Sequence, residues 1–183
     1  MTNEASRLTI LTSNENKAQE FSRLLDVELE RVAVDIPEIQ ETDVTVVARK
    51  KAEEGFSKLN RPCFVDDTGL TVHAWGNLPG ALIKWFIDNV GNNGFIAMLG
   101  GTTSRKATVT TALGYCDKNG SQVFVGELHG TIASAPRGNN GFGYDPIFIP
   151  EGQDKTFAEM TDAERDAISM RALAVKAMKA GLF

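Results

Sequence analysis

Cysteine and histidine are scarce in this sequence, which contains two residues of each. Cys63 and Cys116 are too few for the disulfide framework of a small secreted protein, and because each lies in an apolar run we expect buried, reduced thiols. His73 and His129 have no Cys or His at the spacing of metal ligands, which argues against a zinc site and a Ser-His-Asp triad. Any metal would therefore be a hard cation held by carboxylates.

Long apolar runs and an excess of positive charge are also missing. No run reaches the roughly 18 apolar residues that a membrane-spanning helix needs, and the mean hydropathy is -0.17. The first ten residues lack the pattern of a secretory signal, so we expect a cytoplasmic protein without a membrane segment. The net charge of -5 argues against a protein that coats nucleic acids, and an anionic substrate would need lysine and arginine side chains gathered locally.

Repeats, low-complexity tracts and flexible linkers are absent as well, so we expect residues 1–183 to form a single domain. Segments typical of strands alternate with segments typical of helices, which predicts an α/β fold. Residues 63–75 indicate an apolar strand, an acidic corner and a second strand. Further predicted strands cover residues 7–13, 29–34, 107–116 and 121–132, the last two joined by a hairpin turn at 117–120. Predicted helices cover residues 16–25, 44–59, 82–90 and a final helix that opens at a capping box of Thr161 and Glu164 and stops at Gly181.

The first candidate functional segment is Thr12-Ser13-Asn14-Glu15-Asn16-Lys17, at the corner between the first strand and the first helix. Its short polar side chains, the free N–H groups of the helix N-terminus and the lysine could together hold a phosphate group. An ordinary capped helix with a surface lysine is the alternative. The glycine-rich pattern of a P-loop does not occur in the sequence.

Adjacent carboxylates form the second candidate. Asp66 and Asp67 follow an apolar strand, where an α/β fold can hold Mg²⁺ or position a water molecule, and a solvated turn is the alternative. Because strand side chains alternate, we expect only one of the two aspartates to face a given cleft. Glu38 and Glu41 are further possible metal ligands. The candidate phosphate partners, each with solvated surface as the alternative, are Lys50, Lys51, Lys58 and Lys84.

The third candidate is the segment 134–152, which is rich in glycine and proline and long for a loop inside a compact domain. Phe142 and Tyr144 could stack on a base while Asp145 accepts a hydrogen bond from a base N–H, and plain packing is the alternative. The fourth candidate lies on the last predicted helix, where we expect a solvated face for the polar residues Arg165, Ser169 and Arg171.

Five segments of the sequence together resemble the inosine triphosphate pyrophosphatase family. In chain order they are TSNENK, VDDTGL, LPGALIKWF, APRGNNGFGYDPIFIPEGQDKTFAEM and ISMR. The resemblance covers about residues 7–176, and PRGNNGFGYDPIF followed by TFAEM is its most specific part. It implies an elongated mixed β-sheet flanked by helices, with two lobes around a central substrate cleft. It also implies a homodimer and a Mg²⁺-dependent enzyme that hydrolyses the α–β phosphate bond of deaminated purine nucleoside triphosphates such as ITP, dITP and XTP.

The resemblance also implies roles for individual residues. Asp67 would bind the metal and accept the proton, and Glu38 would be the second metal ligand, with Glu41 in reserve. The residues implied to bind the triphosphate and its surroundings are Thr12, Ser13, Asn14, Lys17, Lys51, Thr68, Lys84 and Arg165. The residues implied to bind the base are Phe142, Gly143, Tyr144, Asp145, Ser169, Met170 and Arg171, with the two aromatic rings on either side of the purine.

Two positions depart from the family. Arg165 stands where the family usually has lysine, and Met170 stands where it has histidine. Arginine keeps the charge with a different donor geometry, whereas methionine removes a hydrogen-bonding group beside the base, so we expect a shifted or relaxed base selectivity. Two alternatives stay open: a related nucleotide pyrophosphatase with another base preference, and a nucleotide-binding protein without catalysis. The acidic charge disfavours an RNA-binding module, so no nucleic acid partner is expected.

Overall fold

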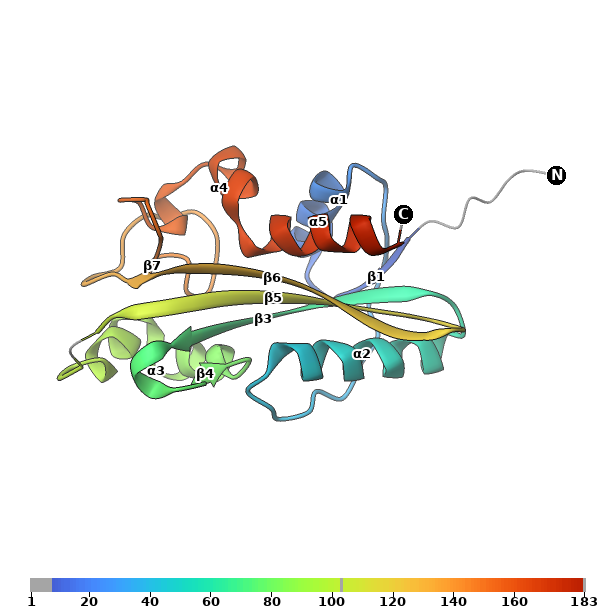
Figure 1. Cartoon of the computed structure of the whole chain (residues 1–183), viewed down its shortest axis with the longest axis horizontal. Coiled ribbons are helices and arrows are strands. Elements are labelled where there is room, and N and C mark those ends of the chain that lie inside the picture. Colours follow the sequence, from blue (N-terminus) through green and yellow to red (C-terminus); the bar gives the residue numbers. More distant parts are fainter. Residues whose placement is uncertain (1–7, 103, 183) are drawn as a thin grey trace.

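The computed structural model of this protein describes residues 8–102 and 104–182. Figure 1 shows a long, twisted β-sheet with helices packed on both sides. In the described part the sheet has seven strands, in the order β2-β1-β3-β5-β6-β7, with β4 paired to β3. The strands are β1 (Thr9–Leu11), β2 (Glu30–Val32), β3 (Cys63–Val72), β4 (Pro79–Gly80), β5 (Lys106–Asp117), β6 (Gly120–Ile132) and β7 (Phe148–Pro150). Because β1 runs parallel to β2 and β3 while the other pairs are antiparallel, the sheet is mixed and the fold is α/β, as predicted.

The helices lie in two groups. In Figure 1, α1 (Glu15–Leu25), α4 (Asp162–Ile168) and α5 (Met170–Leu182) lie on one side of the sheet, and α2 (Val44–Leu59) and α3 (Ile83–Met98) on the other. Two short 3₁₀ helices, η1 (His73–Trp75) and η2 (Phe157–Glu159), connect larger elements. None of the helices in the described ranges is long and apolar enough to cross a membrane.

Helix α2 and the β5–β6 hairpin confirm the clearest local predictions. In α2, Val47, Ala48 and Ala52 are buried at helical spacing, and the side chain of Asp43 caps the helix by accepting from the backbone N–H of Thr45 at 2.8 Å. The hairpin turn lies at 117–120 as predicted. Arg7, with which the predicted first strand begins, lies outside the described residues, and the strand that follows starts at Thr9.

Strand β3 differs from the prediction of two strands around an acidic corner. It runs without a break from Cys63 to Val72, and Asp66 and Asp67 pair with β5 like their neighbours. Both aspartates have lysine partners, so no turn is needed to bring their charges to solvent. At the start of the strand, Cys63 faces Cys116 of β5, and both thiols are buried and free, as predicted.

The C-terminal part also differs from the prediction. Segment 134–152 includes the strand β7, and the predicted last helix is divided into α4 and α5 at Ser169, whose backbone is extended (φ -66°, ψ 154°). The predicted capping box of Thr161 and Glu164 opens α4. Helix α5 continues through Gly181 instead of stopping there, because that glycine makes room for a ring: a Cβ atom at 181 would lie 2.5 Å from Phe124.

A gap in the sheet positions the functional region. Strand β1 meets β3 only at Phe64, and β4 begins to pair with β3 at Leu70. Between these points the edge of β3, residues 65–69, has no described strand beside it. The buried apolar clusters lie around this gap, two of them on opposite faces of the sheet under α1 and α5 and under α2, and one toward α3 and β7. Polar side chains of β3 therefore line a cavity in the middle of the molecule.

Candidate active site

A cavity of about 650 Å³ lies beside the gap in the sheet. Segments far apart in the sequence form its wall: the start of α1, residues 34–41, residues 66–68 of β3, residues 81–88 with the first turns of α3, and the loop 142–145. Lys51 of α2 and Arg171 of α5 complete it. The volume falls within the range of small-molecule sites. The structure therefore brings most of the patches that the sequence singles out to one place.

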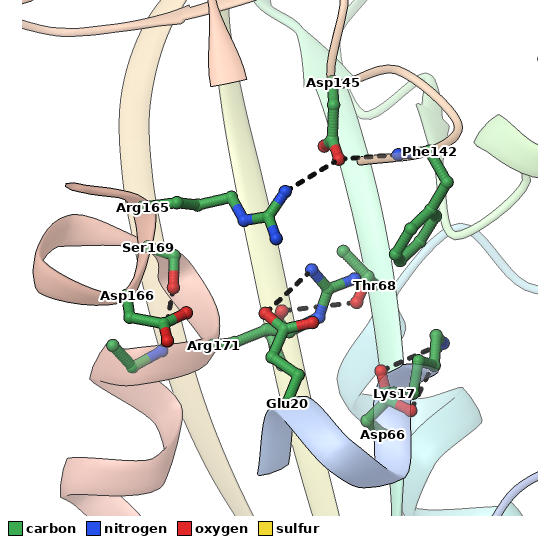
Figure 2. Close-up of polar contacts among 12 residues, drawn as sticks. Lys17, Glu20, Asp66, Thr68, Phe142, Asp145, Arg165, Asp166, Ser169 and Arg171 are labelled. Atoms are coloured by element: carbon green, nitrogen blue, oxygen red, sulfur yellow. Dashed lines mark hydrogen bonds and ion pairs between the residues drawn. The ribbon is translucent and has the colours of Figure 1, made fainter. Parts of the chain in front are cut away.

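The start of α1 carries the candidate phosphate-binding segment to the cavity. The hydroxyl of Thr12 accepts from the backbone N–H of Asn14 at 3.1 Å, and the side chain of Asn14 accepts from the backbone N–H of Lys17 at 3.2 Å. Ser13 lines the cavity between them. Lys17 is not a surface lysine, because its Nζ lies 3.0 Å from Oδ2 of Asp66 (Figure 2). A helix N-terminus and an ammonium group thus meet at the cavity, an arrangement that suits an anion.

The two aspartates of β3 contact different lysines. Neighbouring strand residues point to opposite faces, so Asp66 meets Lys17 of α1, whereas Oδ2 of Asp67 accepts from Nζ of Lys51 at 2.9 Å. Both aspartates nevertheless line the cavity, and the expectation that only one would face a given cleft is wrong. The reason is the gap beside β3, which opens the cavity to both faces of the strand.

The surroundings move the pKa values of these carboxyl groups in opposite directions. Burial raises the pKa of Asp66, but Lys17, Arg171 and Lys51 together outweigh burial and hold that pKa below its ordinary value. Burial raises the pKa of Asp67 to about 6, against the lowering effect of Lys51. Burial lowers the pKa of Lys51, yet Asp67 and Glu38 outweigh it and raise that pKa above its ordinary value. The charged form is thus favoured at Asp66, whereas Asp67 has a pKa raised to about 6.

Glu38 joins Asp67 at the same ammonium group. Its Oε1 accepts from Nζ of Lys51 at 3.0 Å, whereas Glu41, the reserve candidate, accepts from the backbone N–H of Thr42 at 2.6 Å. Within residues 8–102 and 104–182, no group of three or more acidic, histidine or cysteine side chains is arranged to hold a metal ion. Two carboxylates that meet at one point still fit Mg²⁺, which commonly binds one or two carboxylates, substrate phosphates and water.

The loop 141–145 forms the other end of the cavity. Oδ2 of Asp145 accepts from the backbone N–H of Phe142 at 2.9 Å, which closes the loop into a tight turn (Figure 2). Phe142 is 41% exposed, and Cζ of Arg171 lies 5.2 Å from the centre of its ring. Tyr144 is 8% exposed and packs into an apolar cluster, so Phe142 offers the more accessible ring.

A buried ion pair that the sequence does not predict supports Arg171. Its Nη1 lies 3.5 Å from Oε1 of Glu20, and both side chains are 5% exposed (Figure 2). Arg165 is also buried and reaches toward Asp145, with its Nη1 at 3.7 Å from Oδ2. The expectation of a solvated face on the last helix is therefore wrong, because the bend at Ser169 turns Arg171 inward. The sequence signal that could have identified Glu20 is its position one helical turn after Lys17, on the same side of the first helix.

Comparisons with known proteins agree with this arrangement. The sequence matches the Ham1 family over residues 8–181, a span that includes the whole cavity wall. The chain belongs to the Ham1 family. Among curated relatives, the dITP/XTP pyrophosphatase of Methanopyrus kandleri is 40% identical over 174 residues, or 93% of each chain. Inosine triphosphate pyrophosphatase 2 of Trypanosoma cruzi is 39% identical over 178 residues, or 95% of this chain and 91% of the relative.

A solved structure supports the same assignment. The Ham1 protein of Staphylococcus aureus superposes on this chain with a TM-score of 0.85 and 27% sequence identity, covering 97% of this chain and 98% of that one. The Ham1 fold is thus shared along nearly the full length of both proteins.

Not every predicted site residue of this Ham1 chain reaches the cavity. Arg165, Ser169 and Met170 do not line it: Ser169 caps α5 by accepting from the N–H of Ala172 at 3.2 Å, and Met170 is 1% exposed inside an apolar cluster. Lys84 lies at the rim, exposed and paired with Asp88. The predicted residues that do line the cavity are Thr12, Ser13, Asn14, Lys17, Glu38, Glu41, Lys51, Asp67, Thr68, Lys84, Phe142, Gly143, Tyr144, Asp145 and Arg171.

Proposed function

We propose that this protein hydrolyses the non-standard purine nucleoside triphosphates ITP, dITP and XTP to the monophosphate and pyrophosphate. The names of its relatives, dITP/XTP pyrophosphatase and inosine triphosphate pyrophosphatase, support this function. The observation that carries the proposal is a single cavity with Lys51 between two carboxylates and an exposed aromatic ring, Phe142, at its other end. A nucleotide has the matching parts, a triphosphate that needs cations and a flat base that stacks.

We place the triphosphate at the start of α1, where backbone N–H groups and Lys17 stabilise its negative charge. Asp67 accepts a proton from the attacking water, because its pKa of about 6 leaves it ionised at neutral pH. The water oxygen forms a bond to the α-phosphorus, and the bond between that phosphorus and the bridging oxygen breaks. Pyrophosphate leaves, and Lys51 stabilises the charge that develops on it.

Glu38 and Asp67 are the residues that would hold Mg²⁺. When bound, the ion neutralises phosphate charge and polarises the attacking water. Lys51 holds the two carboxylates close to one another.

At the other end of the cavity, Phe142 stacks on the base and Arg171 lies at its edge. The guanidinium group only donates hydrogen bonds, so it favours a keto oxygen of hypoxanthine or xanthine over the amino group of adenine. A group built to bond one substrate discriminates against another by being left unpaired.

The test is pyrophosphate release with Mg²⁺ from ITP, dITP and XTP, compared with ATP, GTP, dUTP and CTP. Asp67→Asn should bind nucleotide and lose turnover by orders of magnitude, whereas Asp26→Asn, an exposed change in a backbone conformation that Asn tolerates, should match the wild type. Equal turnover of all these nucleotides would support the proposed hydrolysis but reject the proposed preference for deaminated purines. Nucleotide binding without turnover in the wild type would favour a binding protein.

We also propose that the protein acts as a homodimer in the cytoplasm, where free nucleotides are available. Sedimentation equilibrium tests the oligomeric state: a dimer has twice the chain mass of 19.8 kDa. A mass equal to one chain at the concentrations used for the activity assay would reject the dimer.

A further inference from the structure

Helix α3 is bent at Gly91, beside the candidate base-binding loop. The backbone of Gly91 (φ 66°, ψ 177°) is not helical, and a Cβ atom added there would meet nothing within 4 Å. The glycine is therefore needed for its backbone conformation, which residues with a side chain disfavour, and not because a side chain would clash with neighbouring atoms. Before the bend, Ile83 and Ile87 line the cavity. After it, Phe95 packs into an apolar cluster.

The first residue after the bend contacts the loop. Nδ2 of Asn92 donates to the backbone carbonyl of Gly143 at 3.1 Å. The loop is also held from within, by the bond from the N–H of Phe142 to Asp145. From behind, the N–H groups of Asn139 and Asn140 donate to Ala158, and Asp145 accepts from the N–H of Ala158 and pairs with Arg165. Among these contacts, the one from Asn92 is the contact with α3. Asn92 thus ties the loop to the helix whose first half forms another wall of the cavity.

The side-chain amide of Asn92 uses only its nitrogen for hydrogen bonding. Its Oδ1 is buried and has no hydrogen-bond partner among the described residues. Burying an unpaired acceptor destabilises the folded state, and leucine would fill a similar volume without it. Packing alone therefore does not account for an asparagine here, whereas the donor directed at Gly143 does.

We propose that Asn92 is a positioning residue for base selection: by holding the carbonyl of Gly143, it fixes the loop that carries Phe142 at the cavity wall. The inference rests on the proposed function, since it concerns how tightly the base site of that activity is defined. Asn92 itself does not line the cavity, so it acts through the loop and not on the substrate.

Two variants of Asn92, with a variant of the neighbouring residue as the control, test this role. Asn92→Leu removes both ends of the amide, and Asn92→Asp keeps the shape but cannot donate. The matched control is Asn93→Leu, a change at the next, exposed residue. For both Asn92 variants we expect kcat/KM for ITP to fall about threefold to tenfold, mainly through KM, as for one lost hydrogen bond. The preference for ITP over ATP should fall by a similar factor, while the Tm of Asn92→Leu stays at or above the wild-type value.

A purely structural role would give the opposite pattern, a lower Tm for Asn92→Leu with unchanged KM and unchanged ITP preference, and would overturn the proposal. Hydrogen exchange of the backbone N–H groups of residues 141–144 provides a readout that does not depend on activity. Exchange should be faster in Asn92→Leu and unchanged in Asn93→Leu, and equal rates in all three proteins would also overturn it. If the wild type shows no turnover but exchange is still faster in Asn92→Leu, the proposed function is rejected. The hydrogen bond from Asn92 would then still be shown to hold the loop.

Discussion

The ammonium group of Lys51 lies within 3.0 Å of two carboxylates, Asp67 and Glu38. Without it, the charge of the exposed Glu38 would lie beside the buried carboxylate of Asp67 uncompensated, and each would favour protonation of the other. The pKa of Asp67 is about 6 with the lysine present. A residue on α2 thus adjusts the basicity of the proposed proton acceptor on β3.

This contact predicts the pH dependence of turnover. We expect kcat/KM for ITP to fall as the pH drops below about 6, because protonated Asp67 cannot accept a proton. In Lys51→Gln the fall should begin at a higher pH, since the lysine lowers the pKa of Asp67. Lys50→Gln, which removes an exposed ammonium group one residue earlier, should keep the wild-type profile. Steady-state kinetics across the acid and neutral range measure this, and an unshifted profile for Lys51→Gln would contradict the assignment.

The ring of Phe142 leads to a second prediction at the residue scale. Phe142→Ala should raise KM for ITP about tenfold, because stacking an aromatic ring on a base contributes about 1–3 kcal/mol. The value of kcat should change little, because the ring lies away from the reacting phosphorus. Phe142→Trp keeps a flat ring and serves as the control. Isothermal calorimetry with a non-hydrolysable analogue gives the same comparison without turnover, and equal affinities would place the base elsewhere.

Among the elements, the sequence predicts those whose signals are local. Helix α2 has its apolar spacing and its cap, Asp43, within its own residues. Strand β3 is misread as two because Asp66 and Asp67 resemble a turn until their partners are known. Those partners, Lys17 and Lys51, lie 49 and 16 residues away.

The same reasoning applies to the candidate site. The segments that carry the family resemblance indicate most of the cavity residues, since those residues lie in short motifs. The inward turn of Arg171 and its partner Glu20 depend on the bend between α4 and α5, and a bend at a serine within a helical pattern has no clear local signal. Met170 is assigned to the base by the resemblance, but the structure packs it in the core.

The bend itself can be tested. Ser169→Ala removes the hydroxyl that accepts from the N–H of Ala172, so the free energy of unfolding should fall by about 1 kcal/mol. KM for ITP should also rise, since α5 carries Arg171 to the cavity. Ser57→Ala on the exposed side of α2 is the control and should stay within about 0.5 kcal/mol of the wild type. Urea unfolding and initial rates provide both values, and a stable variant with unchanged KM would show that the cap is dispensable.

At the scale of the whole molecule, the cavity wall includes residues from Thr12 to Arg171, so a ligand contacts elements from most of the chain. A non-hydrolysable ITP analogue with Mg²⁺, at about 100 times its Kd, should raise the free energy of unfolding by about 2.7 kcal/mol. Chelation with EDTA should remove most of this gain, and inosine, which lacks phosphates, should produce little. Thermal melts measure the shift, and an equal gain with and without Mg²⁺ would contradict the proposed metal ligands.

The packing of α1 against α5 has a consequence for biosynthesis. Helices α1 and α5 lie on the same side of the sheet (Figure 1). Phe21 of α1 and Phe64 of β3 share one apolar cluster with Ala174, Val175 and Met178 of α5. Until the ribosome has released α5, that cluster lacks its cover from this helix, and exposed apolar surface on a nascent chain promotes aggregation. A chain that ended before α5 would lack Arg171 and would expose this apolar cluster to chaperones, so α5 completes both the wall of the candidate active site and the cover of the cluster.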